Sequence, residues 1–135
     1  MIPEAYLDLL EEPVVVALTT MLPDGQPQST PVWCLWDGEN ILINTAVGRK
    51  KDTNVRQNPK VNVLAIDPQN PYRYLEVRGV VKEMRPDPEE AIINQLAQRY
   101  TGKPTYFGEG GVQPNRGDEQ RVTMVIAPIA ISSMG

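Results

Sequence analysis

The feature that most constrains the fold is a succession of short β-branched runs separated by proline- and glycine-rich turns. The longest run, residues 72–84, places Leu75, Val77 and Val81 on one face and charged side chains on the other. A period of two residues predicts a strand with one buried face. Further strands are predicted at residues 14–20, 26–36, 41–45, 61–66 and 120–127.

The connections between the first strands are short enough to favour antiparallel pairing. Pro23-Asp24-Gly25 and Asp37-Gly38 are turn sequences, and two strands joined by such a turn form a hairpin. An open meander of about six strands would leave unpaired edges, which a barrel removes. The sequence therefore predicts a mainly β protein, a small closed or split antiparallel β-barrel with helices at its periphery.

Three helices are predicted around this barrel. Residues 2–12 carry apolar side chains at helical spacing, and residues 53–57 are compatible with a helical turn. The third helix is predicted to have Asp87 as its N-cap, Pro88 at its first position and Glu90 in a capping box. Gly102 is the expected cap at its C-terminal end.

One domain covering residues 1–135 is expected. Chains divide into domains only well above 135 residues, and the proline and glycine clusters lie at turns rather than in a linker. No apolar run reaches the roughly 18 residues that a membrane span requires, and no export signal opens the chain. We therefore expect a cytoplasmic protein with no membrane partner.

The sequence contains no histidine and a single cysteine, Cys34. The absence of imidazole excludes a Ser-His-Asp triad, a Cys-His dyad and every zinc site that uses histidine. A single thiol excludes disulfides within the chain and multi-thiolate metal sites. Cys34 itself lies in an apolar run without a basic neighbour, which predicts a buried, unreactive thiol. No catalytic side chain and no metal site are predicted, so difficult chemistry would have to come from a bound group.

Positive charge is concentrated in residues 49–60. This segment holds five basic residues (Arg49, Lys50, Lys51, Arg56 and Lys60) and one acid, whereas the rest of the chain has 8 basic and 16 acidic residues. Cations in the first turn of a helix are disfavoured by the helix dipole, unless an anion is bound there. Free N–H groups and ammonium groups would together bind a phosphate. A solvated helix face is the equally weighted alternative.

Other features narrow the choice of partner. The net charge of −4 argues against nucleic acid. Neither a Walker sequence nor a Gly-x-Gly-x-x-Gly pattern is present, so a phosphate site would have to be built from side chains on the barrel.

Three groups of residues have both a functional and a structural interpretation. Trp33 and Trp36 are expected to fill the barrel and an interface rather than to stack on a ligand. Tyr72-Arg73-Tyr74 either closes over a ring system or forms an exposed strand edge. Residues 108–111, rich in glycine, are expected to form a surface loop rather than a lid.

Several short motifs occur in a specific order along the chain. They are Asp-Gly-Gln-Pro-Gln at 24–28, Pro-Val-Trp at 31–33 with Trp-Asp-Gly at 36–38, Thr45 followed by Gly-Arg-Lys-Lys at 48–51, Asn-Val-Arg-Gln-Asn-Pro at 54–59, and Asn-Pro-Tyr-Arg-Tyr-Leu-Glu-Val-Arg-Gly at 70–79. This ordered set resembles the flavin and deazaflavin split-barrel proteins related to pyridoxamine 5′-phosphate oxidase, in particular the branch that uses coenzyme F-420. The resemblance implies a six-stranded antiparallel split β-barrel and a homodimer with cofactor sites at the subunit interface.

The resemblance also implies a set of cofactor-binding residues. Those at the phosphate and ribityl end would be Lys50 and Lys51 on the phosphate, with Thr45 and Asn54 beside it. The longer anionic tail of F-420 would suit further cations, and Arg49, Arg56 and Lys60 are available for it. Those at the tricyclic ring would be Thr30, Pro31 and Val32, with Tyr72 and Tyr74 contributed by the partner subunit.

The activity that the resemblance implies is transfer of a hydride from reduced F-420 to an unsaturated small molecule, completed by a solvent proton. FMN is the competing cofactor, so an FMN-binding oxidoreductase is an alternative. A non-catalytic flavin or deazaflavin carrier and a β-barrel interaction module are also left open. Pyridoxamine phosphate oxidases use a C-terminal region with tryptophan, arginine and histidine. This chain lacks that region, so oxidation of pyridoxamine phosphate is not expected.

Overall fold

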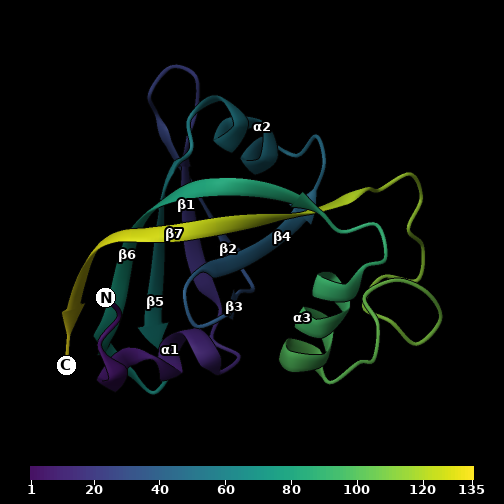
Figure 1. Cartoon of the computed structure of the whole chain (residues 1–135). Helices are drawn as coiled ribbons and strands as arrows, with labels where there is room; N and C mark the ends of the chain where they lie inside the picture. Colours follow the sequence, from purple (N-terminus) through teal and green to yellow (C-terminus); the bar gives the residue numbers. More distant parts are fainter.

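The computed structural model describes residues 1–135 and shows one curled, seven-stranded antiparallel sheet with short helices at its periphery (Figure 1). The strands are β1 Val16–Met21, β2 Pro27–Val32, β3 Leu35–Trp36, β4 Ile41–Ala46, β5 Lys60–Asp67, β6 Asn70–Pro86 and β7 Arg121–Met134. The helices are the 3-10 turn η1 Glu4–Tyr6, α1 Asp8–Glu11, α2 Lys50–Gln57 and α3 Ala91–Thr101. None of these helices combines the length and apolar character that crossing a membrane needs.

The sheet curls into a split barrel because its two edge strands are consecutive in the sequence. The strand order is β2-β1-β5-β6-β7-β4-β3, and only Trp33 and Cys34 connect the last residue of β2 to the first of β3. At this point the N–H of Cys34 donates to the hydroxyl of Tyr100 on α3, at 3.1 Å, instead of to a strand. The single strand predicted at residues 26–36 is therefore wrong. The mainly β split-barrel prediction is confirmed, with seven strands instead of six.

The long strands β6 and β7 cross the front of the sheet side by side (Figure 1). Their pairing extends from Tyr74 opposite Met134 to Pro86 opposite Val122. β7 thus continues seven residues beyond the end predicted at residue 127, because β6 offers a partner that the local sequence does not reveal. A register shift lies at Gly79, where a Cβ atom would be 2.6 Å from the Ile126 side chain. Glycine at this position lets the two bent strands approach closely.

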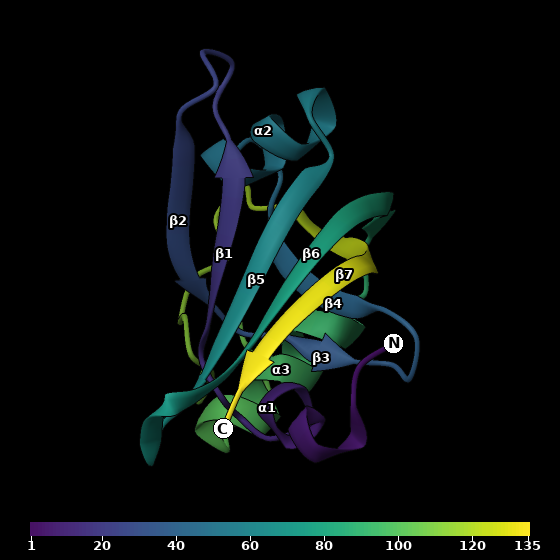
Figure 2. The same cartoon turned by 90° about the vertical axis from the view of Figure 1, so that its left-hand side faces the viewer.

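The principal core is built mainly by the sheet, in which β1, β5, β6 and β7 lie side by side (Figure 2). Its 16 buried residues come mostly from β1, β4, β5, β6 and β7, and α1 adds Leu9 and Leu10 at one end. The helix predicted over residues 2–12 is present only in part, as η1 followed by the single turn of α1. Cys34 belongs to this core and is fully buried, which confirms the expectation for it. Burial raises the pKa of its thiol to about 11.

A second, smaller core lies where α3 covers β3, β4 and β7. Ile93 and Leu96 of α3 pack there against Leu35, Leu42 and Val125 of the three strands. In Figure 1 this helix and the loop that follows it stand beside the sheet rather than inside it. α3 and the loop that follows it therefore meet the sheet near its β3 edge.

The start of α3 differs from the capping box predicted for it. The helix begins at Ala91, because Glu90 adopts a left-handed conformation with φ of 61°. Asp87 still caps the helix, since its carboxylate accepts the N–H groups of Ile92 and Ile93 at 3.3 and 3.0 Å. Glu90 is ion-paired with Arg116 instead. The predicted cap at the other end, Gly102, is confirmed, with φ of 78°.

Candidate functional site

The first element of the site is the junction between β4 and α2. All residues of β4 are buried, and the chain leaves the sheet through Val47 and Gly48 into the first turn of α2. The N–H of Gly48 donates to the Asp52 carboxylate at 2.8 Å, and Arg56 binds the other oxygen of that carboxylate at 2.9 Å. Asp52 is thereby fully engaged. In the same turn of α2, the backbone N–H groups of Lys50, Lys51 and Asp52 have no acceptor within the protein.

This helix start borders a cavity of about 220 Å³ between the sheet edge and α3. Its polar end is formed by Asn44, Thr45, Arg49, Lys51 and Arg121. Its apolar end is formed by Pro31, Val32, Trp33, Ile93, Leu96, Tyr106 and Val112. The cavity is therefore lined both by groups suited to bind charge and by groups suited to contact a flat apolar ligand.

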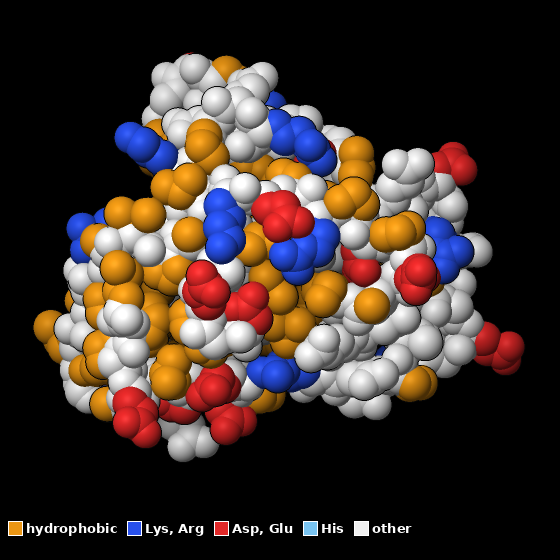
Figure 3. Space-filling view, in the orientation of Figure 1, with side chains coloured by type: hydrophobic (Ala, Val, Ile, Leu, Met, Phe, Trp, Pro, Cys, Tyr) orange, Lys and Arg blue, Asp and Glu red, His pale blue; other side chains and the backbone are white.

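The polar end carries more positive than negative charge. Lys51 has no carboxylate partner, and its pKa is held below the usual value by burial, with Arg49 and Arg121 adding repulsion. Arg49 and Arg121 share one carboxylate, that of Glu119, at 3.7 and 2.6 Å. Three cations thus face a single acid. Figure 3 shows that other Lys and Arg side chains are spread over the surface, several of them beside Asp or Glu side chains.

Arg121 is the most buried of these cations, and a network of hydrogen bonds holds it in place. Its Nε donates to the side-chain oxygen of Asn44 at 2.9 Å, and its guanidinium lies 5.1 Å over the ring of Tyr106. The amide of Asn44 donates in turn to Asp87 at 3.1 Å and to Thr123 at 2.9 Å. The network therefore connects a cation of the cavity to the carboxylate that caps α3.

Thr45 supplies an independent indication that the cavity receives a polar ligand. Its side-chain hydroxyl is buried, and it is the only buried side-chain nitrogen or oxygen atom that has no hydrogen-bond partner. An unsatisfied buried hydroxyl destabilises a protein by about 1–3 kcal/mol. Because Thr45 lines the cavity between Asn44 and Lys51, an anion bound there would satisfy it.

The apolar end has an aromatic wall. Trp33 is stacked on Tyr100 with ring centroids 5.3 Å apart and an interplanar angle of 14°, and Tyr106 meets Trp33 edge-on. Tyr100 is fixed by its hydroxyl, which donates to the carbonyl of Val14 at 2.7 Å. Trp36 packs against the principal core, as expected. Trp33, in contrast, lies in the cavity wall, so the structural interpretation given for it from the sequence is incomplete.

The structure brings together five of the ten residues that the sequence proposed for cofactor binding. Pro31, Val32, Thr45, Arg49 and Lys51 all line the cavity. The other five, Thr30, Lys50, Asn54, Tyr72 and Tyr74, lie outside it.

Each of these five outer residues has a different position. Lys50 is exposed at the first position of α2, and Thr30 is half-buried within β2. Asn54 is buried, and its amide donates to Thr20 and Gln28, which fixes α2 to β1 and β2. Tyr72 and Tyr74 lie at the beginning of β6, and Tyr74 borders a separate depression with Leu64 and Ser132.

Several residues of the cavity had no signature in the sequence. Arg121, Asn44 and Tyr106 come from three different elements, and only the fold brings them together. Asn44 is a polar residue in a strand whose residues are all buried, and a buried amide needs hydrogen-bond partners. Tyr106 lies in the loop between α3 and β7, and Arg121 is the first residue after that loop. The sequence does not predict the shape of this loop.

Comparison with known proteins places this geometry in a family. The chain is 42% identical to a solved structure described as an F-420 reductase, with a TM-score of 0.85 over 97% of this chain and 98% of that one. It is 27% identical to the conserved hypothetical protein Rv2991 from Mycobacterium tuberculosis, with a TM-score of 0.76 over 99% and 85% of the two chains.

More distant structures share the fold alone. HutZ, a heme storage protein from Vibrio cholerae, is 16% identical, with a TM-score of 0.66 over 100% and 96% of the two chains. No curated protein sequence matches the chain. The family model described as pyridoxamine 5′-phosphate oxidase matches residues 2–135. This match covers nearly the whole chain, and the protein therefore belongs to the pyridoxamine 5′-phosphate oxidase family.

Proposed function

We propose that the protein is an oxidoreductase that binds coenzyme F-420, a phosphorylated deazaflavin, and transfers a hydride to an unsaturated small molecule. The observation that carries this proposal is the meeting of three cations and an unpartnered buried hydroxyl beside a flat aromatic wall. The 42% identity to an F-420 reductase over almost the whole of both chains supports a deazaflavin as the ligand.

The residues of the cavity fit the chemistry of such a cofactor. Lys51 and Arg121 would bind the phosphate with charge-assisted hydrogen bonds, and the free N–H groups at the start of α2 would add to them. The hydroxyl of Thr45 would donate to a phosphate or ribityl oxygen. Val32 and Trp33 would lie along the ring.

The roles of the protein in this activity are binding, orientation and exclusion of water. Asn44 would hold the Arg121 guanidinium in position for the phosphate. Ile93 and Leu96 of α3 would keep water from one side of the ring. When bound, the deazaflavin would supply the hydride, so no catalytic side chain is required.

We further propose that a second copy of the chain completes the site. A cavity of about 220 Å³ is smaller than the about 300–1,000 Å³ of typical small-molecule sites, so it would hold only part of the cofactor. A candidate dimer surface lies on the outer face of the sheet, where Ile66, Tyr74 and Met134 are neighbours on adjacent strands. Tyr72 and Val15 add exposed apolar area nearby. Contiguous exposed apolar surface of this kind is typical of an interface.

This arrangement would give Tyr72 and Tyr74 a role that they cannot have within one chain. Both lie outside the cavity of their own protomer, so they would reach the ring only from the partner. The substitution Tyr74→Glu is expected to shift the protein from dimer to monomer in light scattering and to weaken cofactor binding. A monomeric wild-type protein would contradict the proposal.

FMN is the second candidate cofactor, since the polar end of the cavity recognises a phosphate and FMN carries one. F-420 has in addition a long anionic tail, for which the exposed cations Arg49, Lys50 and Lys60 are available. Binding of F-420 is therefore expected to weaken more with added salt than binding of FMN. Equal affinity and equal salt dependence for the two cofactors would argue against a preference for F-420.

The decisive experiment is a fluorescence titration of the purified protein with F-420 and with FMN, preceded by an absorbance spectrum. Binding in the micromolar range is expected, and binding of neither at tens of micromolar would contradict the proposed function. Lys82→Ala is a matched control for substitutions in the cavity, because Lys82 is an exposed lysine that lies outside both the cavity and the basic segment. Turnover with quinones or enones would then distinguish an enzyme from a cofactor carrier.

A further inference from the structure

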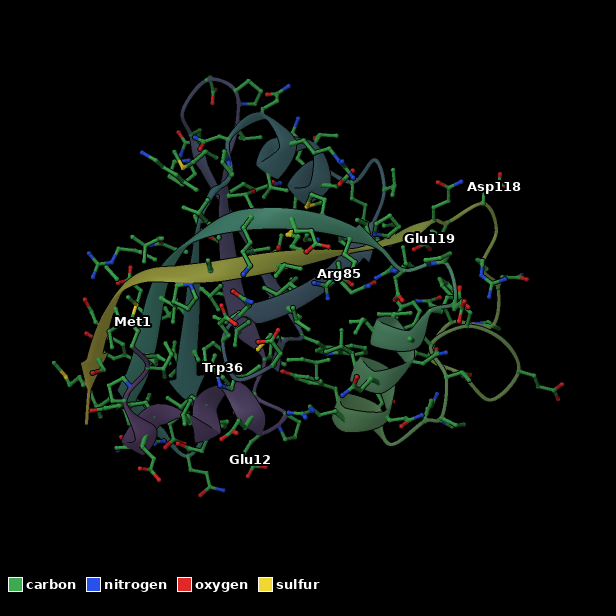
Figure 4. The ribbon with its side chains drawn as sticks, viewed as in Figure 1. Met1, Glu12, Trp36, Arg85, Asp118 and Glu119 are labelled. Carbon is green, nitrogen blue, oxygen red and sulfur yellow. The ribbon has the colours of Figure 1, made fainter.

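Glu119 is the one acid that contacts the cations of the cavity. It lies where the chain enters β7 (Figure 4). A single oxygen, Oε1, is 2.6 Å from a terminal nitrogen of Arg121 and 3.7 Å from a terminal nitrogen of Arg49. Glu119 therefore neutralises part of the charge that a ligand phosphate would meet.

The position of Glu119 sets it in competition with a ligand. Arg49 and Arg121 both line the cavity of about 220 Å³. Glu119 lines a neighbouring cavity of about 550 Å³ instead, and Arg121 is the residue that the two cavities share. The carboxylate thus attracts the guanidinium of Arg121 towards the neighbouring cavity. Lys51, which has no carboxylate partner, is left to face the cavity without such an opposing attraction.

We propose that Glu119 is a specificity-determining residue, a built-in competitor that sets the charge a ligand must carry. This inference rests on the proposed function, because the phosphate of the cofactor is the group with which Glu119 would compete. The monoester phosphate of FMN carries nearly two negative charges at neutral pH. F-420 joins a singly charged phosphodiester to the carboxylates of its tail, so either cofactor would bring more negative charge to the two arginines than the single carboxylate of Glu119. A ligand with one negative charge has no such advantage over Glu119.

The inference predicts an effect opposite to that of removing a supporting residue. Glu119→Gln keeps the size of the side chain and removes its charge. Its affinity for F-420 and for FMN is expected to rise about three- to tenfold, as for the loss of one part-exposed ion pair. If Glu119 instead positioned the arginines for the ligand, the same substitution would weaken binding.

Glu109→Gln is the matched control, since Glu109 is an exposed carboxylate of the same loop with no ion pair. It changes the net charge of the protein equally and is expected to leave both affinities within about twofold. Equal effects of the two substitutions would mean that overall charge, not competition, is responsible. That result would overturn the inference, and so would unchanged or weaker binding by Glu119→Gln.

Two additions keep the test decisive. Glu119→Ala should also bind more tightly, and it replaces Glu119→Gln if that variant fails to fold. If the wild-type protein binds neither cofactor, the proposed function fails, and titration with pyrophosphate then tests Glu119 alone. Tighter pyrophosphate binding by the Glu119 variants than by the wild type would support the competition, and equal or weaker binding would refute it.

Discussion

The two longer helices of this protein begin in opposite ways. α3 is preceded by a buried carboxylate, Asp87, which accepts two of its first N–H groups. α2 has no side chain capping its first turn, and two lysines and an arginine surround that turn. The one acid of the α2 first turn, Asp52, is occupied by Gly48 and Arg56.

This difference distinguishes a structural helix terminus from the proposed binding site. The positive end of the helix dipole favours an anion at both helix starts. α3 receives that anion from its own chain, so its start is complete without a ligand. The one anion at the start of α2, Asp52, is bound to Gly48 and Arg56, so no anion of the chain accepts the free N–H groups of its first turn or pairs with Lys51. The comparison therefore supports the proposal that the binding site lies at the start of α2, the helix whose first turn carries cations where the dipole favours an anion.

The largest effect is expected when α3 loses its internal anion. Asp87→Ala would leave the N–H groups of Ile92 and Ile93 and the amide of Asn44 without their acceptor in a buried setting. We expect the free energy of unfolding, measured by urea denaturation, to fall by about 3 kcal/mol. Glu89→Ala, at an exposed position in the same connection, is the control. A loss below about 1 kcal/mol would show that Asp87 does not complete the α3 start.

The next effect concerns the ligand instead of stability. Lys51→Ala is expected to weaken cofactor binding by about 1.5–3 kcal/mol, the contribution of a hydrogen bond to a charged group. Its urea denaturation should change little, because Lys51 has no partner within the protein.

Lys50→Ala is the variant to compare with Lys51→Ala, because the two lysines are adjacent in α2 but only Lys51 lines the cavity. The family resemblance places Lys50 on the phosphate as well, but the structure leaves it exposed and outside the cavity. We therefore expect less than about threefold loss of affinity, within the range of exposed charge pairs. Equal losses for the two lysines in a fluorescence titration would show that the phosphate lies farther out along α2 than the cavity indicates.

The sequence predicted the features that depend on neighbouring residues and missed those that depend on tertiary contacts. Strand periodicity and turn residues were sufficient for β1, β4, β5 and most of β6, because those patterns are local. The break at Trp33 and Cys34 was not predictable, since it depends on a hydroxyl that lies 66 residues away in the chain. Arg121 was not predicted as a cavity residue for the same reason. Lys51 and Thr45, which the family resemblance singled out, do line the cavity. The cations at the positive end of the predicted helix drew attention to the start of α2. The other residues of the cavity come from distant parts of the chain, so only the fold shows that they lie beside it.

The charge of Lys51 makes binding depend on pH. Its pKa is lowered by burial and by the two neighbouring arginines. A bound anion favours the protonated amine, so binding should be strongest below the pKa of the free protein and weaken as the pH rises through it. The decline should begin at a lower pH than for an exposed lysine, with a slope of no more than about tenfold per pH unit.

The variant Lys51→Arg tests the assignment of this pH dependence, because a guanidinium stays protonated throughout the accessible range. Titrations with FMN from about pH 7.5 upward avoid the second ionisation of its monoester phosphate near about pH 6. The decline in affinity should be absent from the variant. A decline of the same size in both proteins would assign it to another group.

The smallest effect is expected at Thr45, where stability and binding should change in opposite directions. Thr45→Val replaces the unpartnered hydroxyl with a methyl group of similar size, which removes a buried polar atom that the free protein leaves unsatisfied. The free energy of unfolding is expected to rise by about 0.5–1 kcal/mol, while cofactor affinity falls by up to about 1 kcal/mol because one hydrogen bond is lost. Thr123→Val is the informative contrast, since the Thr123 hydroxyl already accepts from Asn44 and its loss should lower stability. If Thr45→Val destabilised the free protein as Thr123→Val is expected to, the hydroxyl would have a structural function, and the α2 start would resemble that of α3 more closely than the contacts indicate.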